Sequence, residues 1–352
     1  MISILASFVF AIGTYGSQIY EVSYSRGVFS VLDSIPASNA SYLARDASGA
    51  LYGCSENDPD SGVYLFPGFG SEDPAGQTVF GPSGSNGPCH ILLPEDSPWA
   101  MTADYGAGSI TVFCKDSLAS GPVQTIKFAE GSHVHQLTMV PSSDLMVATD
   151  LGLNCIHVFR LDRYGDTSSP LTELPDLAVP CSGGPRHVAF NDDVSVMYCL
   201  TEKSGEIVAY KVWRDAAVTG EPCLVAEDVK SDPTPAVTVG LLTEFQRVKA
   251  DEVDAHGSAD IRISGKYLFA SHRLENDGIS VYRIGKDGKL KKKGYCHTGV
   301  HPRCFVVEGR LVFVACRDSH SIEVYRFNRL TGKLKKRPAE LKLDSRPVCI
   351  IN

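Results

Sequence analysis

The sequence predicts an all-β fold, a seven-bladed β-propeller, and two features of the chain predict it. A unit of three short strands recurs at intervals of about 43–50 residues, which is the spacing of propeller blades rather than of helical repeats. The two ends of the chain hold complementary halves of that unit. Pairing the N- and C-terminal strands would close the ring and remove the free sheet edges at the junction.

The clearest copy of the unit covers residues 184–210. It begins with a polar Pro-Arg-His triplet at 185–187, continues as an apolar strand, and turns at Asn-Asp-Asp, 191–193. A second strand ends on Thr-Glu at 201–202, and a third strand follows a Ser-Gly turn. Val, Ile, Tyr and Phe recur with period two between turns rich in Gly, Asp, Asn and Ser, which is typical of β-strands.

Further copies align on the same triplet, some of them partial. They cover residues 39–65, 87–113, 133–159, 257–282 and 301–325. Residues 346–351 resemble a first strand without its continuation, and residues 8–22 resemble a second and third strand without a first. The two halves make one blade only if the chain ends pair, which brings the total to seven.

We expect a single domain, residues 1–352, with an enlarged insertion between two blades at about residues 213–256. The interval after Tyr210 is about 74 residues, longer than the other intervals by roughly 25–30. Fourth strands such as residues 289–297 lie between the units, and no long amphipathic helix is evident.

Composition limits the partners of the protein. The chain is 43% hydrophobic and 21% charged, which indicates a globular protein rather than a disordered one. Its net charge of −8 gives no support for nucleic-acid binding, so any positive site must be local. No sequence feature indicates an oligomeric state.

The cysteines and the N-terminus bear on location. The 11 cysteines form no Cys-x-x-Cys pair, which argues against a zinc site, and their scatter favours a reducing, cytoplasmic compartment. Residues 1–12 are apolar like a short signal peptide but have no basic start and are too short to span a membrane. The propeller instead favours a buried strand here, and we expect no membrane partner.

The repeat predicts where polar side chains gather. The first strand of each blade lines the central channel and the second runs antiparallel to it, so starts of first strands and ends of second strands share one face. The first-strand starts contribute Cys89, His90, His133, His135, Arg186, His187, Asp260, Arg262, Arg303 and Arg346. The second-strand ends contribute Glu56, Asp104, Tyr105, Asp150, Glu202, His272, Arg273 and Arg317.

Individual members of this set also have structural interpretations. Asp104 and Asp150 are better explained as carboxylates that cap turns. His90 and His187 adjoin apolar strand residues and are equally well explained as satisfied core histidines. The functional interpretation therefore rests on the convergence of several arginines, histidines and glutamates on one channel mouth.

Such a mouth suits an anionic ligand and a proton transfer. Arginine binds carboxylate or phosphate groups bidentately, and histidine can exchange a proton near neutral pH. Together they favour a reaction in which oxyanion charge develops, such as the opening of an activated ester. The chain has no Gly-x-Ser-x-Gly elbow, no phosphate-binding P-loop and no dinucleotide fingerprint.

Over essentially its whole length the sequence resembles the seven-bladed propeller lactonase family. That family includes the propeller-type 6-phosphogluconolactonases and the 3-carboxy-cis,cis-muconate lactonizing enzyme. The similarity lies in Gly-Thr-Tyr at 13–15, His-Val-His at 133–135 with Thr-Asp-Leu-Gly at 149–152, and Pro-Arg-His at 185–187 with Glu202. It continues in Ala-Asp-Ile-Arg at 259–262, Ser-His-Arg at 271–273 and His-Pro-Arg at 301–303.

The resemblance implies a lactonase that uses no cofactor or metal and acts on a small anionic lactone, foremost 6-phosphoglucono-δ-lactone of the pentose phosphate pathway. It implies that His135 moves the proton with help from Glu202 and that Arg186 stabilises the oxyanion. The remaining candidates would bind substrate: Glu56, His133, His187, Asp260, Arg262, His272, Arg273, Arg303 and Arg317. Two alternatives remain open, a carboxymuconate-type cycloisomerase and a non-catalytic propeller that serves as a binding scaffold.

Overall fold

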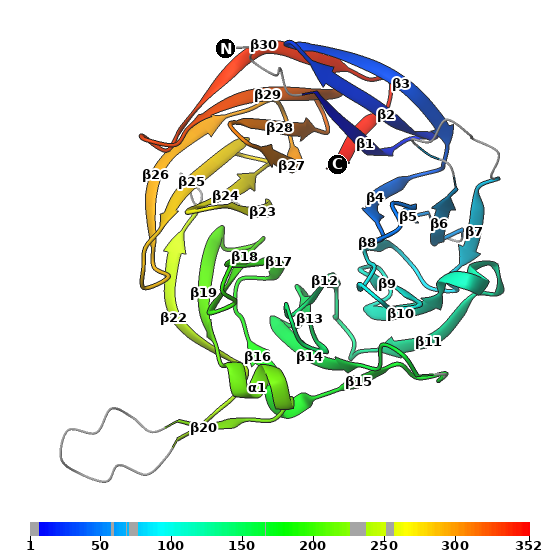
Figure 1. Ribbon diagram of the computed structural model, residues 1–352, viewed down its shortest axis with the longest axis vertical. Helices are drawn as coiled ribbons and strands as arrows, with labels where there is room; N and C mark the ends of the chain where they lie inside the picture. Colours follow the sequence, from blue (N-terminus) through cyan, green and yellow to red (C-terminus); the bar gives the residue numbers. More distant parts are fainter. Residues whose placement is uncertain are drawn as a thin grey trace.

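The computed structural model describes residues 7–57, 60–67, 69, 77–165, 167–225, 237–250 and 257–352. Seven antiparallel sheets stand in a ring around a central channel, which confirms the predicted seven-bladed propeller (Figure 1). Six sheets have four strands and the third blade has a fifth short one. The innermost strands of neighbouring blades contact one another around the ring, so they form the channel wall.

Within each blade the strands follow one another from the channel outward. The first three blades comprise β4 (Ala40–Arg45), β5 (Leu51–Ser55), β6 (Gly62–Phe66) and β7 (Val79–Pro82); β8 (Pro88–Leu92), β9 (Trp99–Asp104), β10 (Ser109–Cys114) and β11 (Pro122–Lys127); and β12 (Val134–Met139), β13 (Leu145–Asp150), β14 (Cys155–Leu161) and β15 (Leu171–Glu173), with β16 (Val179–Pro180) beside β14. Short 3₁₀ turns lie at Lys115–Ser120 and Pro175–Leu177.

The next three blades repeat the arrangement. They comprise β17 (Pro185–Phe190), β18 (Val196–Thr201), β19 (Glu206–Val212) and β22 (Leu242–Lys249); β23 (Ser258–Ser264), β24 (Tyr267–His272), β25 (Gly278–Ile284) and β26 (Leu290–His297); and β27 (Pro302–Glu308), β28 (Leu311–Cys316), β29 (Ser321–Asn328) and β30 (Lys333–Lys342). The strands thus fall where the sequence repeat predicts them.

The seventh blade joins the two ends of the chain. Its inner strand is β31 (Arg346–Ile351), which pairs with β1 (Phe8–Tyr15), and β2 (Gln18–Ser25) and β3 (Val28–Pro36) complete the sheet. Its aromatic side chains pack against blade six, where the Phe313 ring lies 4.6 Å from the Phe10 ring and 5.0 Å from the Tyr24 ring, measured between centroids. The predicted closure by pairing of the termini is therefore confirmed.

The described part of the segment at 213–256 lies at the outside of the ring. It contains the helix α1 (Arg214–Thr219) and a hairpin of β20 (Cys223–Val225) and β21 (Val237–Val239), and then supplies β22, the outer strand of blade four. Figure 1 places α1 and β20 at the outer rim, away from the channel. Residues 226–236 and 251–256 lie outside the described residues. No helix in the described part of the chain is long and apolar enough to cross a membrane.

Candidate active site

A β-bulge near the start of the inner strand recurs around the ring. The pairing between first and second strands skips one residue, which is Cys89 in β8, His135 in β12, Arg186 in β17 and Arg303 in β27. A bulge bends its strand and re-aims the side chain of the extra residue. The repeated bulge thus explains why residues from different blades converge at one mouth of the channel.

The ends of the second strands supply the other side chains through their period of two. The last strand residue points into its blade and is fully buried, as seen at Ser55, Asp104, Asp150, Thr201 and His272. Because successive side chains point to opposite faces, the next residue is presented to the mouth. Glu56, Tyr105, Glu202 and Arg273 occupy these next positions and all line the same cavity.

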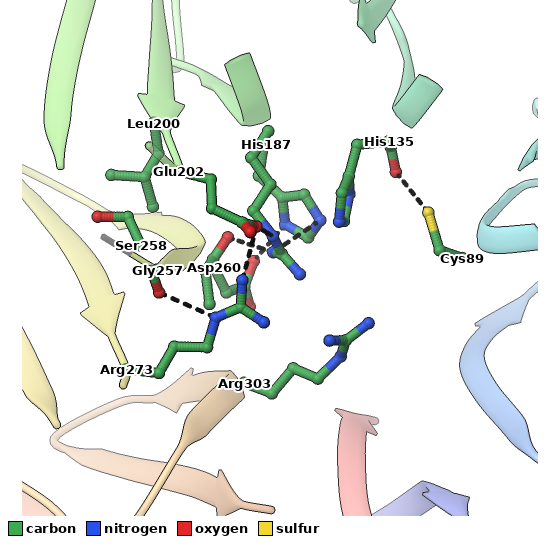
Figure 2. Close-up of polar contacts among 12 residues, drawn as sticks. Cys89, His135, His187, Leu200, Glu202, Gly257, Ser258, Asp260, Arg273 and Arg303 are labelled. Carbon is green, nitrogen blue, oxygen red and sulfur yellow. Dashed lines mark hydrogen bonds and ion pairs between the residues drawn. The ribbon is translucent and has the colours of Figure 1, made fainter. Parts of the chain in front are cut away.

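The cavity at the channel mouth has a volume of about 280 Å³. Five predicted site residues line it, from five different blades: Glu56, His135, Glu202, Arg273 and Arg303. Tyr15, Gly87, Cys89, Tyr105 and Gly106 complete the lining. Figure 2 shows His135, Arg273 and Arg303 extending from different blades toward the same central space.

Glu202 is the centre of a compact ionic cluster. Its Oε2 accepts hydrogen bonds from Arg186 Nε at 2.7 Å and from Arg273 Nη2 at 2.6 Å. Burial raises the pKa of the Glu202 carboxyl, but Arg273 and Arg186 outweigh it, so the pKa lies below its usual value. Burial and the nearby Arg186 lower the pKa of Arg273 to about 9. Glu202 is therefore a carboxylate that holds two guanidinium groups together.

A second ionic pair faces this cluster across the mouth. Arg303 Nη2 lies 3.6 Å from Glu56 Oε1, and its guanidinium stands 5.1 Å from the centre of the Tyr15 ring. Glu56 is fixed in turn by Tyr15 Oη at 2.7 Å and by Ser41 Oγ at 2.6 Å. Arg303 is thus held on one side and presents the rest of its planar donor set to the cavity.

The imidazole of His135 has no hydrogen-bonding partner in the part of the chain that the structure describes, although only 4% of the residue's surface is exposed. Its Nδ1 is buried, so Nε2 is the nitrogen that can meet a ligand in the cavity. Burial, and then the charges of Arg186 and Arg303, lower the pKa of His135 well below its usual value. His135 is therefore neutral at neutral pH and has a lone pair available for a proton.

Cys89 beside His135 is not a candidate nucleophile. Its Sγ donates weakly to the carbonyl oxygen atoms of Val134 and His135, at 3.8 and 3.4 Å. Burial, and then the charge of Glu56, raises the pKa of the Cys89 thiol. A thiol with a raised pKa forms little of the reactive thiolate.

Arg186 does not line the cavity. The family resemblance implies that it stabilises the oxyanion, but its side chain is only 2% exposed and lies behind Glu202, outside the cavity lining. Besides Glu202 it donates to the carbonyl oxygen of Ala259 and to His187. Arg186 therefore bonds Glu202 without lining the cavity, whereas Arg273 and Arg303 do line it.

Three further predicted residues form a polar group in the channel wall that is joined to the Glu202 cluster through Arg186. His187 Nδ1 lies 3.0 Å from Asp260 Oδ1, and Arg262 Nε lies 3.0 Å from Asp260 Oδ2. Burial raises the pKa of Asp260, but Arg262 and His187 outweigh it and hold that pKa below its usual value. None of the three lines the mouth cavity, so their predicted contact with substrate is not seen.

The structure places His272, Arg317 and His133 away from the cavity lining. His272 fills the interior slot of blade five, where Nδ1 bonds Ser258 Oγ at 2.8 Å and Nε2 bonds Ser280 Oγ at 2.9 Å. Its position follows from the period of two, because adjacent residues such as His272 and Arg273 cannot both face the mouth. His272 therefore does not line the cavity, and its predicted contact with substrate is not seen.

Arg317 and His133 lie at the rim. Arg317 is occupied by a bidentate pair with Asp318, at 2.7 and 2.8 Å. His133 stacks on the cavity residue Tyr105, with ring centroids 4.4 Å apart, and its Nδ1 bonds the Tyr105 carbonyl at 2.9 Å. His133 therefore supports a lining residue rather than lining the cavity itself.

The two aspartates interpreted as structural have that role. Asp150 accepts hydrogen bonds from Ser132 and from the backbone N–H groups of His133, Gly152 and Leu153. Asp104 is bonded by three hydroxyl groups, those of Thr102, Ser109 and Thr111. Both carboxylates are fully buried and stabilise their own blades.

Tyr15 also lines the cavity, although it is not among the predicted site residues. It ends β1, the second strand of the closing blade, and so occupies a position comparable to Glu56 and Glu202. Tyr105 and Cys89 were placed at the mouth by the repeat but given no role. Across the described ranges, no group of three or more His, Cys, Asp or Glu side chains is arranged to hold a metal ion.

Comparison with known proteins is consistent with this geometry. The family described as Lactonase, 7-bladed beta-propeller, matches residues 9–352. A 6-phosphogluconolactonase of Formosa agariphila is 28% identical over 281 residues, 74% of this chain and 72% of that protein. The 6-phosphogluconolactonase of Bacillus subtilis is 25% identical over 340 residues, 89% of this chain and 86% of that protein.

Solved structures share the whole fold. A candidate 6-phosphogluconolactonase from Bacteroides fragilis superposes with a TM-score of 0.83 at 28% identity, covering 98% of this chain and 97% of that one. The periplasmic gluconolactonase of Pseudomonas aeruginosa superposes with a TM-score of 0.78 at 20% identity, covering 98% and 99%. The second likeness concerns the fold alone.

Proposed function

Because this chain belongs to the seven-bladed β-propeller lactonase family, we propose that it hydrolyses an anionic sugar lactone, foremost 6-phosphoglucono-δ-lactone. The curated relatives from Formosa agariphila and Bacillus subtilis bear the name 6-phosphogluconolactonase, which supports that substrate. The eleven free cysteines suit a reducing compartment and support action in the cytoplasm.

The observation that supports the proposal most is the pairing of a free base with arginines in one small cavity. His135 faces the cavity with no partner among the described residues, and Arg273 and Arg303 line the same space. The three guanidinium groups at the mouth, counting Arg186, exceed the two carboxylates of Glu56 and Glu202 by one positive charge. This positive excess favours a negatively charged substrate.

In the proposed reaction His135 acts as the general base. Its neutral imidazole accepts a proton from water, and the water oxygen adds to the lactone carbonyl carbon. The carbonyl electron pair moves onto the oxygen, and Arg273 or Arg303 stabilises that oxyanion. When the tetrahedral intermediate collapses, the bond from the carbonyl carbon to the ring oxygen breaks, and imidazolium returns the proton to the ring oxygen.

Glu202 supports this chemistry without taking the proton in our proposal. Its Oε2 is shared by two arginines and its pKa is lowered, so it is a poor base. Oε1 has no hydrogen bond to any described residue and can accept one from a substrate hydroxyl or from the attacking water. None of these roles needs a metal ion, and we expect EDTA to leave the rate unchanged.

The experiment is a comparison of 6-phosphoglucono-δ-lactone with glucono-δ-lactone, each corrected for spontaneous hydrolysis. We expect the wild type to prefer the phosphorylated lactone. Arg303→Ala should raise KM for it by roughly tenfold to a hundredfold, since a charged hydrogen bond is worth about 1.5–3 kcal/mol. Arg337→Ala, an exposed arginine on the outer strand β30, is the matched control.

Two outcomes would contradict the proposal. Wild-type turnover no faster than the spontaneous reaction on either lactone would exclude the activity. An equal rise in KM for both lactones in Arg303→Ala would remove the argument that Arg303 binds the anionic group of the substrate.

A further inference from the structure

Glu202 anchors a chain of polar contacts that runs into blade five through His187. Arg186, which donates Nε to Glu202 Oε2, also donates Nη1 to His187 Nε2 at 3.3 Å. The other ring nitrogen, His187 Nδ1, lies 3.0 Å from Asp260 Oδ1. The order of contacts is therefore carboxylate, arginine, histidine and aspartate, and Figure 2 shows Glu202, His187 and Asp260 lying close together.

A second series of polar contacts begins at the same oxygen of Glu202 and has the same order of groups. Arg273, which donates Nη2 to Glu202 Oε2, also donates Nη1 to His301 Nε2 at 3.4 Å. His301 Nδ1 faces Asp318, with Oδ2 at 3.5 Å. The first series of contacts joins blades four and five, and the second joins blades five and six. The same order of groups is therefore formed by different parts of the sequence.

The donor and acceptor properties of the partners favour one protonation state for both histidines. A guanidinium group only donates hydrogen bonds, so each Nε2 that meets an arginine must offer a lone pair. An ionised carboxylate only accepts, so the proton of each ring belongs on Nδ1, toward the aspartate. Both His187 and His301 are 96% or more removed from solvent, with exposures of 3% and 4%, so water does not compete for these positions.

We propose that His187 and His301 are positioning residues that, as neutral Nδ1–H imidazoles, hold Arg186 and Arg273 on a single oxygen of Glu202. The consequence is that Glu202 Oε1 and the free edge of Arg273 keep fixed places at the cavity. The proposal deepens the function given above and rests on it for its effect on turnover. The hydrogen-bond pattern itself does not depend on the substrate.

The electrostatic surroundings agree with neutral rings. Burial and Arg186 lower the pKa of His187 to about 4, against the opposing effect of Asp260. Burial and Arg273 lower the pKa of His301 to about 3. Other groups that face the two rings are, for His187, Arg262, His135, His90 and Tyr42, and, for His301, Arg303, Arg317, Asp318 and Asp277.

The arrangement has a physical purpose, since two guanidinium groups on one oxygen repel each other. The lowered pKa of Arg273, about 9, reflects burial first and then the nearby Arg186. Each arginine also donates to a backbone carbonyl oxygen, Arg186 to that of Ala259 and Arg273 to that of Gly257 at 2.9 Å. The histidine adds a side-chain acceptor behind each arginine, which further offsets the repulsion and limits rotation of the guanidinium plane.

The first test replaces each histidine by two residues that differ in one property. In His301→Gln the side-chain oxygen can still accept from Arg273, whereas in His301→Leu it cannot. His187→Gln and His187→Leu form the same pair for Arg186. The readouts are KM and kcat for 6-phosphoglucono-δ-lactone and Kd for the product 6-phosphogluconate, with thermal unfolding to establish that each variant is folded.

We expect each Leu variant to weaken product binding by roughly 10–100-fold, the size of a lost hydrogen bond to a charged group, and each Gln variant to recover most of that loss. Equal values for Gln and Leu would overturn the proposal, since they would show that only ring volume counts. Unfolding of a Leu variant with a folded, active Gln variant would support it.

The second test reads the tautomer in the substrate-free wild type. Nitrogen NMR should show two buried histidines that are neutral and protonated on Nδ1 down to about pH 5, because their pKa values lie near 4 and 3. Assignment uses the Gln variants, each of which removes one signal set. Protonation on Nε2 would overturn the positioning role even if lactone is turned over. The expected tautomers in a protein that opens no lactone would instead refute only the proposed function.

Discussion

Blades three and five each place a buried histidine near the channel mouth, and the two differ in what surrounds them. His135 of blade three sits on a bulge, lines the cavity, and has neither ring nitrogen bonded to a described residue. His272 of blade five ends a regular second strand, and both its nitrogens bond serine hydroxyl groups inside the blade. Both residues are buried, so the hydrogen-bond partners distinguish a candidate catalyst from a core residue.

The strongest way to break this comparison is His135→Ala. We expect lactone turnover to fall by about 10²–10⁴-fold, the range of a lost general base, with little change in stability. Rates corrected for spontaneous hydrolysis and the midpoint of urea unfolding measure the two effects. His297→Ala, an exposed histidine on outer strand β26, should retain wild-type rates. Activity near wild type in His135→Ala would remove His135 as the base.

His272→Leu should show the opposite pattern. Loss of the ring leaves two buried hydroxyl groups, those of Ser258 and Ser280, without this partner, at a cost of about 2–5 kcal/mol of unfolding free energy. The triple variant His272→Leu, Ser258→Ala, Ser280→Ala should recover part of that loss, because matched apolar groups need no partner. Urea unfolding measures both. A stable but inactive His272→Leu would mean that His272 acts in the reaction.

The pH profile sharpens the role of His135. A base must be neutral to act, and burial with the charge of Arg186 sets the pKa of His135 well below 6.5, so its active form persists as the pH falls. An ordinary histidine with a pKa of about 6.5 would leave only about a tenth of kcat/KM at pH 5.5, whereas we expect most of it to remain. A half-maximal rate near pH 6.5 would contradict this assignment.

The smallest effect is expected at Arg317, which is paired with Asp318 at the rim. Its loss should change KM by less than about fivefold, in keeping with the 0–1 kcal/mol of a surface ion pair. Steady-state kinetics beside Arg303→Ala measures the contrast. An effect of Arg317→Ala as large as that of Arg303→Ala would show that the binding surface extends beyond the described cavity.

The sequence predicted which polar segments meet at the mouth, but not which of two adjacent residues in a segment faces the cavity. The polar positions at the mouth were predicted, and Glu56, His135, Glu202, Arg273 and Arg303 do meet there. Period two could have excluded His272 once Arg273 was placed at the mouth. Arg186 could not be assigned in this way, because its final position depends on Glu202 and Ala259, which lie 16 and 73 residues further along the chain.

The sequence by itself determined the number of blades, their order and the closure of the ring. These follow from local information, namely apolar residues with period two, turn residues between them, and half a unit at each terminus. Only the tertiary structure decided which side chains face the cavity. The bulges at Cys89, His135, Arg186 and Arg303 exist only as a mismatch between paired strands, and the neutrality of His135 arises from burial among charges that other blades supply.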